Sequence, residues 1–391
     1  MARITLEITR PVVHWTEGGN AHSARWHSEK AAPPPRRVIV ADDRMAADEA
    51  YGLACQGTGL LWRGDFQNAR QMLNALASRA DRQARKPGKT AAASVPRSAA
   101  EVFNLHRQAR SQRARTLGML LVELGPDYGM PLRRAPDLRR ACAEAYGPGE
   151  EPSVASLREL LGIVGAHEWR VNGIGIPAVG GRIHPHYGVF APIRREYVDL
   201  VAEAPLPVAW TSSGLAFDIG TGTGVLAAVL ARRGVGRVVA TDQDPRALAC
   251  ARENLERLGL AGQVEVVQAD LFPEGRAALV VCNPPWVPAR PSSPLEHGIY
   301  DHDSRMLRGF LGALPGHLEP AGEGWLILSD LAEHLGLRSR SELLALFDAA
   351  GLKVVGRTDV RPVHPRASDA ADPLHAARAA EVTSLFRLAL R

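Results

Sequence analysis

The sharpest local signal in this chain is the stretch Phe217-Asp218-Ile219-Gly220-Thr221-Gly222-Thr223-Gly224. The apolar run Leu215 to Ile219 leads into it, and a helical pattern from Val225 to Arg233 follows it directly. Glycines between a strand and a helix let the backbone turn tightly and approach a ligand that a Cβ atom would push away. The stretch therefore predicts a strand-turn-helix unit with a ligand at the turn.

Strand and helix patterns alternate from this point to the end of the chain. The further strand patterns are Arg237–Thr241, Val264–Gln268, Ala278–Cys282, Trp325–Ser329, Leu352–Arg357 and Val382–Leu390. The helix patterns are Pro245–Leu258, Ser304–Leu314 and Ser341–Ala350, with Arg194–Val201 ahead of the first strand. Alternation at this spacing predicts an α/β, doubly wound domain whose mostly parallel sheet is covered on both faces.

Acidic residues follow the second and third strands. Asp242 lies 24 residues after Asp218 and is placed to accept hydrogen bonds from ribose hydroxyls. Asp270 follows the third strand, where a carboxylate can meet an adenine amino group. A glycine turn with a purely structural role does not explain these positions. The glycines read G-x-G-x-G rather than G-x-G-x-x-G, and no phosphate-binding lysine follows. The pattern favours S-adenosylmethionine over NAD.

The fourth strand ends in Asn283-Pro284-Pro285-Trp286. Two prolines stop the strand, so the Asn283 amide and the Pro284 carbonyl are held at the carboxyl edge of the sheet, where ligands bind in such folds. Together these acceptors can bind both hydrogens of a planar –NH₂ group and direct its lone pair at an electrophile. Trp286 can stack on the flat acceptor. The motif predicts methyl transfer to a planar nitrogen.

The four motifs, at 218–224, 241–242, 269–270 and 283–286, resemble in order those of class I S-adenosylmethionine-dependent methyltransferases that act on an amino or amide nitrogen. Within that class, the order of helical region, β-hairpin and catalytic domain resembles the protein-glutamine methyltransferases of translation release factors. The resemblance covers about residues 165–391. It implies a Rossmann-like, seven-stranded sheet in the order 3-2-1-4-5-7-6.

The resemblance also implies roles for individual residues. The cofactor-binding residues would be Asp218, Gly220, Thr221, Gly222 and Gly224 on the methionine and ribose side, Asp242 at the ribose and Asp270 at the adenine. The catalytic residues would be Asn283, Pro284, Pro285 and Trp286, with Trp286 standing where the family usually has Tyr. Aromatic Phe190 is a further candidate to cover the methionine moiety. It lies in Gly188–Glu196, which partly matches a Pro-Arg-Pro-Glu-Thr-Glu-like segment of the family.

We expect three parts in the chain: residues 1–165 as a mainly helical, basic substrate-recognition region, 166–190 as a β-hairpin hinge, and 191–391 as the methyltransferase domain. The N-terminal helix patterns are Asp65–Ala80, Ser98–Leu121, Leu138–Tyr146 and Ser153–Leu161. Ser98 and Glu101 form a capping-box pattern at the start of the second of these helices. Asn172-Gly173 and Gly180-Gly181 are turn signals within the expected hairpin.

Positive charge is concentrated in residues 79–115, which hold ten Lys and Arg against two Asp and Glu, whereas the whole chain has a net charge of +5. Arg107, Arg110 and Arg113 recur at intervals of three and are candidate substrate-binding residues that contact phosphate. The alternative is a solvated helix face, which is what charge runs usually are.

Other function classes are less favoured. The four cysteines lie far apart without a C-x-x-C pair, so neither a disulfide framework nor a zinc knuckle is expected. His184 and His186 have the spacing of metal ligands on a strand, but we find no third ligand and expect no metal. No apolar run is long enough to span a membrane, and Met1–Thr16 lacks the apolar stretch of a secretory signal. We expect a cytoplasmic protein.

The sequence thus predicts an enzyme that methylates a planar nitrogen, with a glutamine side-chain amide of a translation protein as the first choice of acceptor. An exocyclic amine of ribosomal RNA or of DNA is the second choice, because the same motif occurs in enzymes of both kinds. A non-catalytic RNA-binding protein on the same fold is the alternative from another class. The sequence does not give the modified position, the oligomeric state or the role of residues 1–50.

Overall fold

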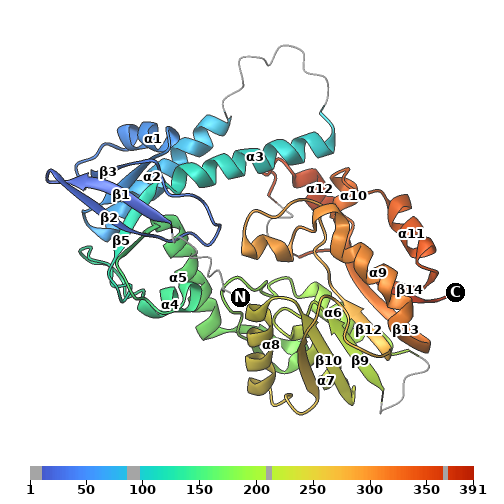
Figure 1. The fold of residues 1–391 in the computed structure, drawn as a ribbon. Helices are drawn as coiled ribbons and strands as arrows, with labels where there is room; N and C mark the ends of the chain where they lie inside the picture. The colour runs from blue at the N-terminus through green and yellow to red at the C-terminus, as the bar shows by residue number, and fades with distance from the viewer. Residues whose placement is uncertain (1–10, 86–96, 208–213, 364–368) are drawn as a thin grey trace, which may run out of the picture. The chain divides into compact units, whose positions relative to one another are not determined.

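The computed structural model describes residues 11–85, 97–207, 214–363 and 369–391. The chain divides into two compact units (Figure 1). The first unit comprises Met1–Pro96 and Asn104–His167, and the second comprises Arg97–Phe103 and Glu168–Arg391. Each unit is built around its own β-sheet.

The second unit contains a seven-stranded sheet in the spatial order β11-β10-β9-β12-β13-β15-β14. Its strands are β9 (Leu215–Ile219), β10 (Arg237–Asp242), β11 (Val264–Gln268), β12 (Ala277–Cys282), β13 (Leu318–Ser329), β14 (Leu352–Val360) and β15 (Thr383–Leu390). Numbered along the chain, this is the expected order 3-2-1-4-5-7-6. The five strands β9 to β13 pair in parallel, and β15 is antiparallel to both of its neighbours.

Helices cover both faces of this sheet (Figure 1). One face is covered by α6 (Glu196–Glu203), α7 (Val225–Arg232) and α8 (Pro245–Arg257), and the other by α9 (Arg305–His317) and α11 (Arg340–Ala349). The unit also contains the short helices α10 (Leu331–His334) and α12 (His375–Ala380). Successive residues of β9 point to opposite faces, as the pleat requires. Ala216 belongs to the core formed with α6, α7 and α8, whereas Phe217 belongs to the core formed with Phe310 of α9 and Phe347 of α11. The expectation of a doubly wound α/β domain is confirmed.

The first unit contains a six-stranded mixed sheet in the order β1-β2-β6-β5-β4-β3. Its strands are β1 (Val12–Glu17), β2 (Asn20–Trp26), β3 (Arg37–Ala41), β4 (Thr58–Trp62), β5 (Leu120–Leu124) and β6 (Ser153–Ser156). The helices are α1 (Ala47–Cys55), α2 (Phe66–Arg85), α3 (Ala99–Leu117), α4 (Arg139–Tyr146) and α5 (Leu157–Asn172). Apolar residues of α2 such as Met72 and Leu76 pack against Leu60 of β4, while Leu61 packs on the opposite face.

The expectation that residues 1–165 are mainly helical is therefore wrong in one respect, because it omits the sheet. The expected helix Ser98–Leu121 runs into the strand Leu120–Leu124, and Ser153–Ser156, expected to begin a helix, is also a strand. Both are short runs of buried residues, and such runs carry no periodicity that separates a central strand from a buried helix. The helix α5 starts only at Leu157, where the Ser156 hydroxyl accepts a hydrogen bond from the Glu159 N–H at 3.1 Å.

The start of α3 belongs to the second unit. The expected capping box is present, with the Glu101 N–H donating to Ser98 Oγ at 3.2 Å and the Ser98 N–H donating to Glu101 Oε2 at 2.8 Å. Phe103, only 3% exposed, packs with Val287 and Leu335 near the N-P-P-W motif. Residues 97–103 thereby contribute to the core of the second unit.

The expected hairpin at 166–190 is shorter than predicted. The helix α5 continues to Asn172, so only β7 (Ile174–Ile176) and β8 (Gly181–Ile183) form the hairpin, with a 3₁₀ turn at Pro177–Val179 between them. The side chains of Trp169 and Val171 lie on the exposed end of α5, at 45% and 54% exposure. Both residue types are common in β-strands, which led to the expectation of a strand here. Their position in the last turn of α5 outweighs this local strand preference.

Among the residues that the structure describes, no helix combines the length and the apolar character needed to cross a bilayer.

Candidate cofactor and acceptor site

The candidate residues lie along one edge of the seven-stranded sheet. β9, β10, β11 and β12 run parallel and in register, with Ile219 of β9 opposite Thr241 and Cys282, and Asp242 opposite Gln268. Their carboxyl ends therefore meet at one edge, which is where ligands bind in open α/β sheets. The glycine loop, both acidic positions and the N-P-P-W motif all follow these strand ends.

The glycine loop has a backbone that only glycine adopts easily. Gly220, Gly222 and Gly224 have φ values of 70°, 55° and 80°, all in the left-handed region. Gly224 also precedes α7, and a Cβ added there would lie 3.2 Å from the Cα of Ala251 in α8. The loop is anchored to the next strand by the Thr221 N–H, which donates to the Thr241 carbonyl at 2.8 Å. These glycines are required by the turn itself.

Asp218 stabilises the glycine loop through hydrogen bonds. Its carboxylate is 1% exposed, and Oδ2 accepts from the Thr221 hydroxyl at 2.6 Å and from the Ala227 N–H in α7 at 3.0 Å. Burial raises the pKa of Asp218 to about 6. The carboxylate is thus directed at the loop and the helix that it holds, and it is not exposed at the methionine side of a cofactor as expected.

Asp242 is the carboxylate that both shapes the loop and remains partly exposed. Its Oδ2 accepts from the Gly222 N–H, and its Oδ1 accepts from the Asp244 N–H, each at 3.0 Å. Burial raises its pKa. Each carboxylate oxygen has a further lone pair, so the group retains capacity for the two hydroxyls of a ribose. These hydrogen-bond acceptors thus fit the ribose of a nucleoside cofactor at this position.

Asp270 and Phe190 lie at the margins of the site. The Asp270 side chain is 75% exposed, and its Oδ2 lies 3.9 Å from the Arg305 guanidinium. Phe190 is half-buried beside Gly298, where an added Cβ would lie 2.7 Å from Phe190 Cβ. Asp270 is accessible to a ligand, whereas Phe190 is packed against the loop that follows the N-P-P-W motif.

The N-P-P-W motif continues directly from β12. The Trp286 indole N–H donates to Asn283 Oδ1 at 2.9 Å, while the guanidinium of Arg194 lies over the Trp286 ring at 4.8 Å from its centroid. After the motif, the Val287 N–H donates to the Ile299 carbonyl at 3.2 Å, which ties the loop back on itself. The motif is therefore held by the contacts of Trp286 and by the hydrogen bond between Val287 and Ile299.

Sequence reasoning missed Arg194 and Glu381 as contributors to this region. Both Arg194 terminal nitrogens donate to Glu381 Oε1 at 3.0 Å, and Arg194 Nε donates to Glu196 at 2.8 Å. Arg194 and Glu381 are separated by 187 positions, so no local pattern could have paired them. The only signal was the partial family match of Gly188–Glu196.

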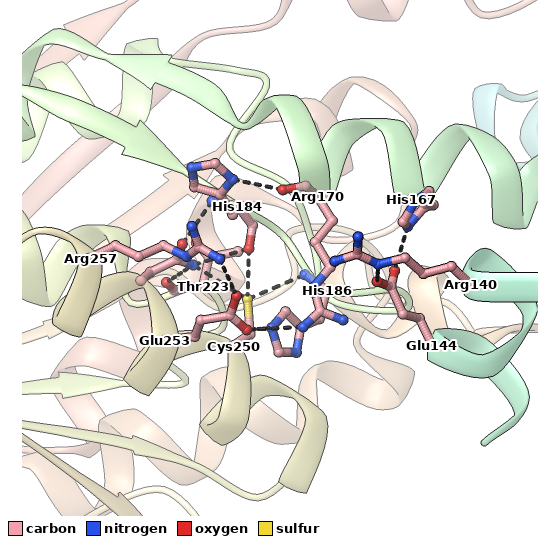
Figure 2. Close-up of polar contacts among 11 residues, drawn as sticks. Arg140, Glu144, His167, Arg170, His184, His186, Thr223, Cys250, Glu253 and Arg257 are labelled. Carbon is pink, nitrogen blue, oxygen red and sulfur yellow. Dashed lines mark hydrogen bonds and ion pairs between the residues drawn. The ribbon is translucent and has the colours of Figure 1, made fainter. Parts of the chain in front are cut away.

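His184 and His186 belong to a hydrogen-bond network rather than to a recognisable metal site (Figure 2). His184 Nδ1 lies 2.7 Å from the Arg170 carbonyl, and His186 Nε2 lies 2.6 Å from Glu253 Oε2. Although burial raises the pKa of Glu253, hydrogen bonds from Arg257 and His186 lower it to about 2. Within the described ranges, no group of three His, Cys, Asp or Glu residues is arranged to hold a metal ion.

The same network reaches the glycine loop (Figure 2). Asn254 of α8 is 1% exposed, accepts from the His184 N–H at 2.7 Å and donates to the Thr223 carbonyl at 3.0 Å. The hairpin β7–β8 and the loop are thus joined through one buried amide.

The basic residues of α3 belong to the first unit. Arg113 donates to Asp81 at 2.7 Å, so part of its charge is already neutralised. Burial, followed by the charges of Arg113 and Arg110, lowers the pKa of Arg158, so positive charge does gather here. Lys86 and Lys89 lie outside the described residues. Whether the cluster binds phosphate stays a prediction.

Parts of the chain are similar to proteins described as methyltransferases. Residues 181–335 match the family described as "Methyltransferase small domain". Over 72 residues, the chain is 57% identical to "Ribosomal protein L11 methyltransferase" of Pelotomaculum thermopropionicum, covering 18% of this chain and 23% of the relative. Over 150 residues, it is 32% identical to "Release factor glutamine methyltransferase" of Cereibacter sphaeroides, covering 34% of this chain and 51% of the relative.

Among solved structures, a ribosomal protein L11 methylase from Lactobacillus delbrueckii subsp. bulgaricus aligns with a TM-score of 0.36 and 16% identity, over 54% of this chain and 85% of that chain. The chain spans about half or less of the length of the two curated relatives named above.

Proposed function

We propose that this chain, which carries a class I S-adenosylmethionine-dependent methyltransferase domain, transfers a methyl group to a planar nitrogen of a translation-related substrate. The observation that carries the proposal is the meeting of the glycine loop, Asp242 and Asn283 at the carboxyl edge of one sheet. Only the tertiary structure brings these three features together, because they come from three different strand ends.

The cofactor would be held by the chain's own donors and acceptors. The glycine loop gives close backbone approach, Asp242 retains lone pairs for the ribose, and exposed Asp270 is available to the adenine. When bound, S-adenosylmethionine supplies an electrophilic methyl group on a sulfonium centre. Asp218 acts indirectly by fixing the loop through Thr221. The residues present therefore fit this cofactor.

The acceptor would be held by the N-P-P-W motif. Asn283 is partly exposed, and its Oδ1 keeps one lone pair beyond the hydrogen bond from Trp286. That lone pair and the Pro284 carbonyl can accept the two hydrogens of an –NH₂ group. These hydrogen bonds orient the nitrogen lone pair before transfer, and the cationic nitrogen that results then loses a proton to water. No side chain of this motif has to act as a strong base.

A glutamine amide of a translation protein is the favoured acceptor. Relatives named release factor glutamine methyltransferase align over 150 and 149 residues of this chain, and methylation of a glutamine amide belongs to the reaction class proposed here. The exposed apolar side chains Ile193, Leu295 and Ile299 come from the segment before α6 and the loop after the motif, which suits a protein surface better than a phosphate backbone.

An exocyclic amine of ribosomal RNA is the second candidate, and the charge of Arg110, Arg113 and Arg158 in the first unit favours it. A non-catalytic RNA-binding role is the third possibility. It is less favoured because the residues that would bind the cofactor and the acceptor are all present at one sheet edge.

The test is to incubate the full chain with methyl-labelled S-adenosylmethionine and a lysate containing ribosomes and release factors. We expect label in a fraction that protease destroys and nuclease leaves intact. Label sensitive to nuclease would move the acceptor to RNA. No transfer, together with RNA binding but no cofactor binding, would establish the non-catalytic alternative.

Asn283→Ala tests the role of the Asn283 amide in turnover. We expect turnover to fall by at least 100-fold while the Kd of S-adenosylmethionine stays within about two-fold, because the amide contacts the acceptor and not the cofactor. Isothermal titration gives the Kd and the label assay gives the rate. An unchanged rate would remove Asn283 from the mechanism.

A further inference from the structure

The Trp286 side chain is engaged on two sides within the catalytic unit. Its indole N–H donates to Asn283 Oδ1 at 2.9 Å, and the Arg194 guanidinium lies over its ring at 4.8 Å from the centroid. The indole also packs, partly buried, against the apolar cores on both faces of the sheet. The indole therefore makes contacts within the protein that stacking on a substrate would not require.

The hydrogen bond fixes the direction of the Asn283 amide. The final torsion of an Asn side chain is broad and roughly two-fold, so the oxygen and the –NH₂ group can exchange places at little cost. An indole nitrogen is a donor only, so it must face the amide oxygen and not the amide nitrogen. Trp286 therefore selects one of the two amide orientations.

This selection matters for an acceptor that carries hydrogens on its nitrogen. In the selected orientation, Oδ1 stays at the indole side and has one lone pair left for the acceptor –NH₂. In the flipped orientation, the Asn283 –NH₂ would face the acceptor –NH₂, and two donors cannot hydrogen-bond to each other. The orientation thus decides whether Asn283 attracts or repels the acceptor.

Arg194 in turn holds the indole. Its guanidinium stacks on the ring at a distance typical of a cation–π contact, and its three nitrogens donate to Glu381 and Glu196. Glu381 is 4% exposed and also accepts from the Ser329 hydroxyl at 2.7 Å. Glu381 is buried, and its Oε1 accepts from both terminal nitrogens of Arg194 and from Ser329, so these charge-assisted hydrogen bonds restrict the movement of the guanidinium. The ring of Trp286 consequently rests on a rigid support.

We propose that Trp286 is a positioning residue that sets the orientation of the Asn283 amide, and that Arg194, held by Glu381, sets the position of Trp286. The proposal rests on the proposed function, since it concerns the same acceptor. It gives the indole a role that a phenyl ring at this position cannot perform, because a phenyl ring has no N–H to donate. It also means that one face of Trp286 is already covered by Arg194.

The first test is independent of activity. In protein labelled with ¹⁵N-tryptophan, the indole signal of Trp286 is assigned by its loss in Trp286→Phe. We expect Asn283→Ala to shift this signal and to speed its exchange with solvent, whereas Asn104→Ala, at an exposed position of α3, leaves it unchanged. An indole signal indifferent to Asn283→Ala would overturn the hydrogen bond and with it the proposal, whatever the enzyme does.

The second test uses turnover of the acceptor. Trp286→Phe keeps an aromatic ring and removes the N–H, so we expect kcat to fall about five- to ten-fold with the Kd of S-adenosylmethionine unchanged. In the double variant with Asn283→Ala, Trp286→Phe should cause no further loss, because the amide that it orients is gone. Additive losses would contradict the proposal. Absence of methyl transfer by the unmodified protein would instead contradict the proposed function.

Arg194→Lys tests the support of the ring. A lysine keeps the charge but cannot stack its plane on the indole or donate from a fork, so we expect kcat to fall about three-fold and the Trp286 indole signal to broaden. Arg195→Lys is the matched control, because Arg195 is the neighbouring arginine and its side chain is exposed. Equal behaviour of the two variants would remove Arg194 from the proposal.

Discussion

At the scale of single residues, Asp218 shows how a motif position can serve the site without lying in it. The sequence places an acidic residue two positions before the first glycine, and the structure directs its carboxylate to Thr221 and Ala227. The group is buried, so its ionised form is disfavoured. Its position in the motif was predictable, whereas the direction of its side chain depended on the loop that folds over it.

This burial predicts a pH dependence of stability. Burial raises the pKa of Asp218 from 3.8 to about 6, so below about pH 3 the carboxyl is protonated in both the folded and the unfolded state and does not change the free energy of unfolding. Between about pH 4 and 6 the unfolded chain ionises first, and stability falls by up to about 3 kcal/mol. Asp218→Asn stays neutral and can keep both hydrogen bonds through its amide oxygen.

Urea unfolding of the unmodified protein and of Asp218→Asn, both without cofactor, tests this pH dependence of stability. The free energy of unfolding of the variant minus that of the unmodified protein should rise by about 3 kcal/mol from pH 4 to pH 7. A difference that does not change with pH would show that Asp218 is not a buried, titrating group.

At the scale of elements, the hairpin β7–β8 and the helix α8 act together on the glycine loop. Asn254 joins them, because it bonds His184 on one side and Thr223 on the other. The sequence predicted the hairpin, the helix and the loop separately. It could not predict their connection, since His184 and Asn254 are 70 positions apart and neither lies in a recognisable motif.

Replacing this amide should weaken both the fold and the site. Asn254→Ala leaves the Thr223 carbonyl and the His184 N–H without a partner in a buried region. We expect the free energy of unfolding to fall by about 2–3 kcal/mol and the Kd of S-adenosylmethionine to rise about three- to ten-fold. Denaturant unfolding and isothermal titration measure the two effects.

Glu256→Ala provides the control, because Glu256 is exposed on the same helix. Its effect on the free energy of unfolding should stay within about 0.5 kcal/mol. If the two variants were equally stable, the buried amide would have no part in holding the loop.

At the scale of the whole molecule, the chain combines two α/β units that share helices. The helix α3 begins with residues of the second unit and continues in the first, and α5 ends in the second unit. The basic residues of α3 lie in the first unit, where Arg110 and Arg113 act on Arg158. This unit is the part of the chain that we expect to recognise the substrate.

That expectation predicts a salt-dependent contact with RNA. If Arg107 and Arg110 neutralise phosphates, changing both to Gln should weaken binding of ribosomal RNA in every sequence context and reduce the slope of log K against log salt by about two. Filter binding at several salt concentrations measures the slope. Arg237→Gln, an exposed arginine of the second unit, should leave it unchanged. Equal slopes for all three proteins would make the basic stretch an ordinary solvated surface.

Local patterns in the sequence were enough to predict the α/β fold of the second unit and to propose the candidate site residues. Strand and helix periodicity gave the alternation, and glycines at 220, 222 and 224 meet a local demand for positive φ. The tertiary structure alone decided the sheet of the first unit, since Leu120–Leu124 becomes a strand only through its neighbours. It also decided that Arg194 and Glu381 support Trp286. Pairing between distant segments depends on packing and burial, which no local stretch of sequence records.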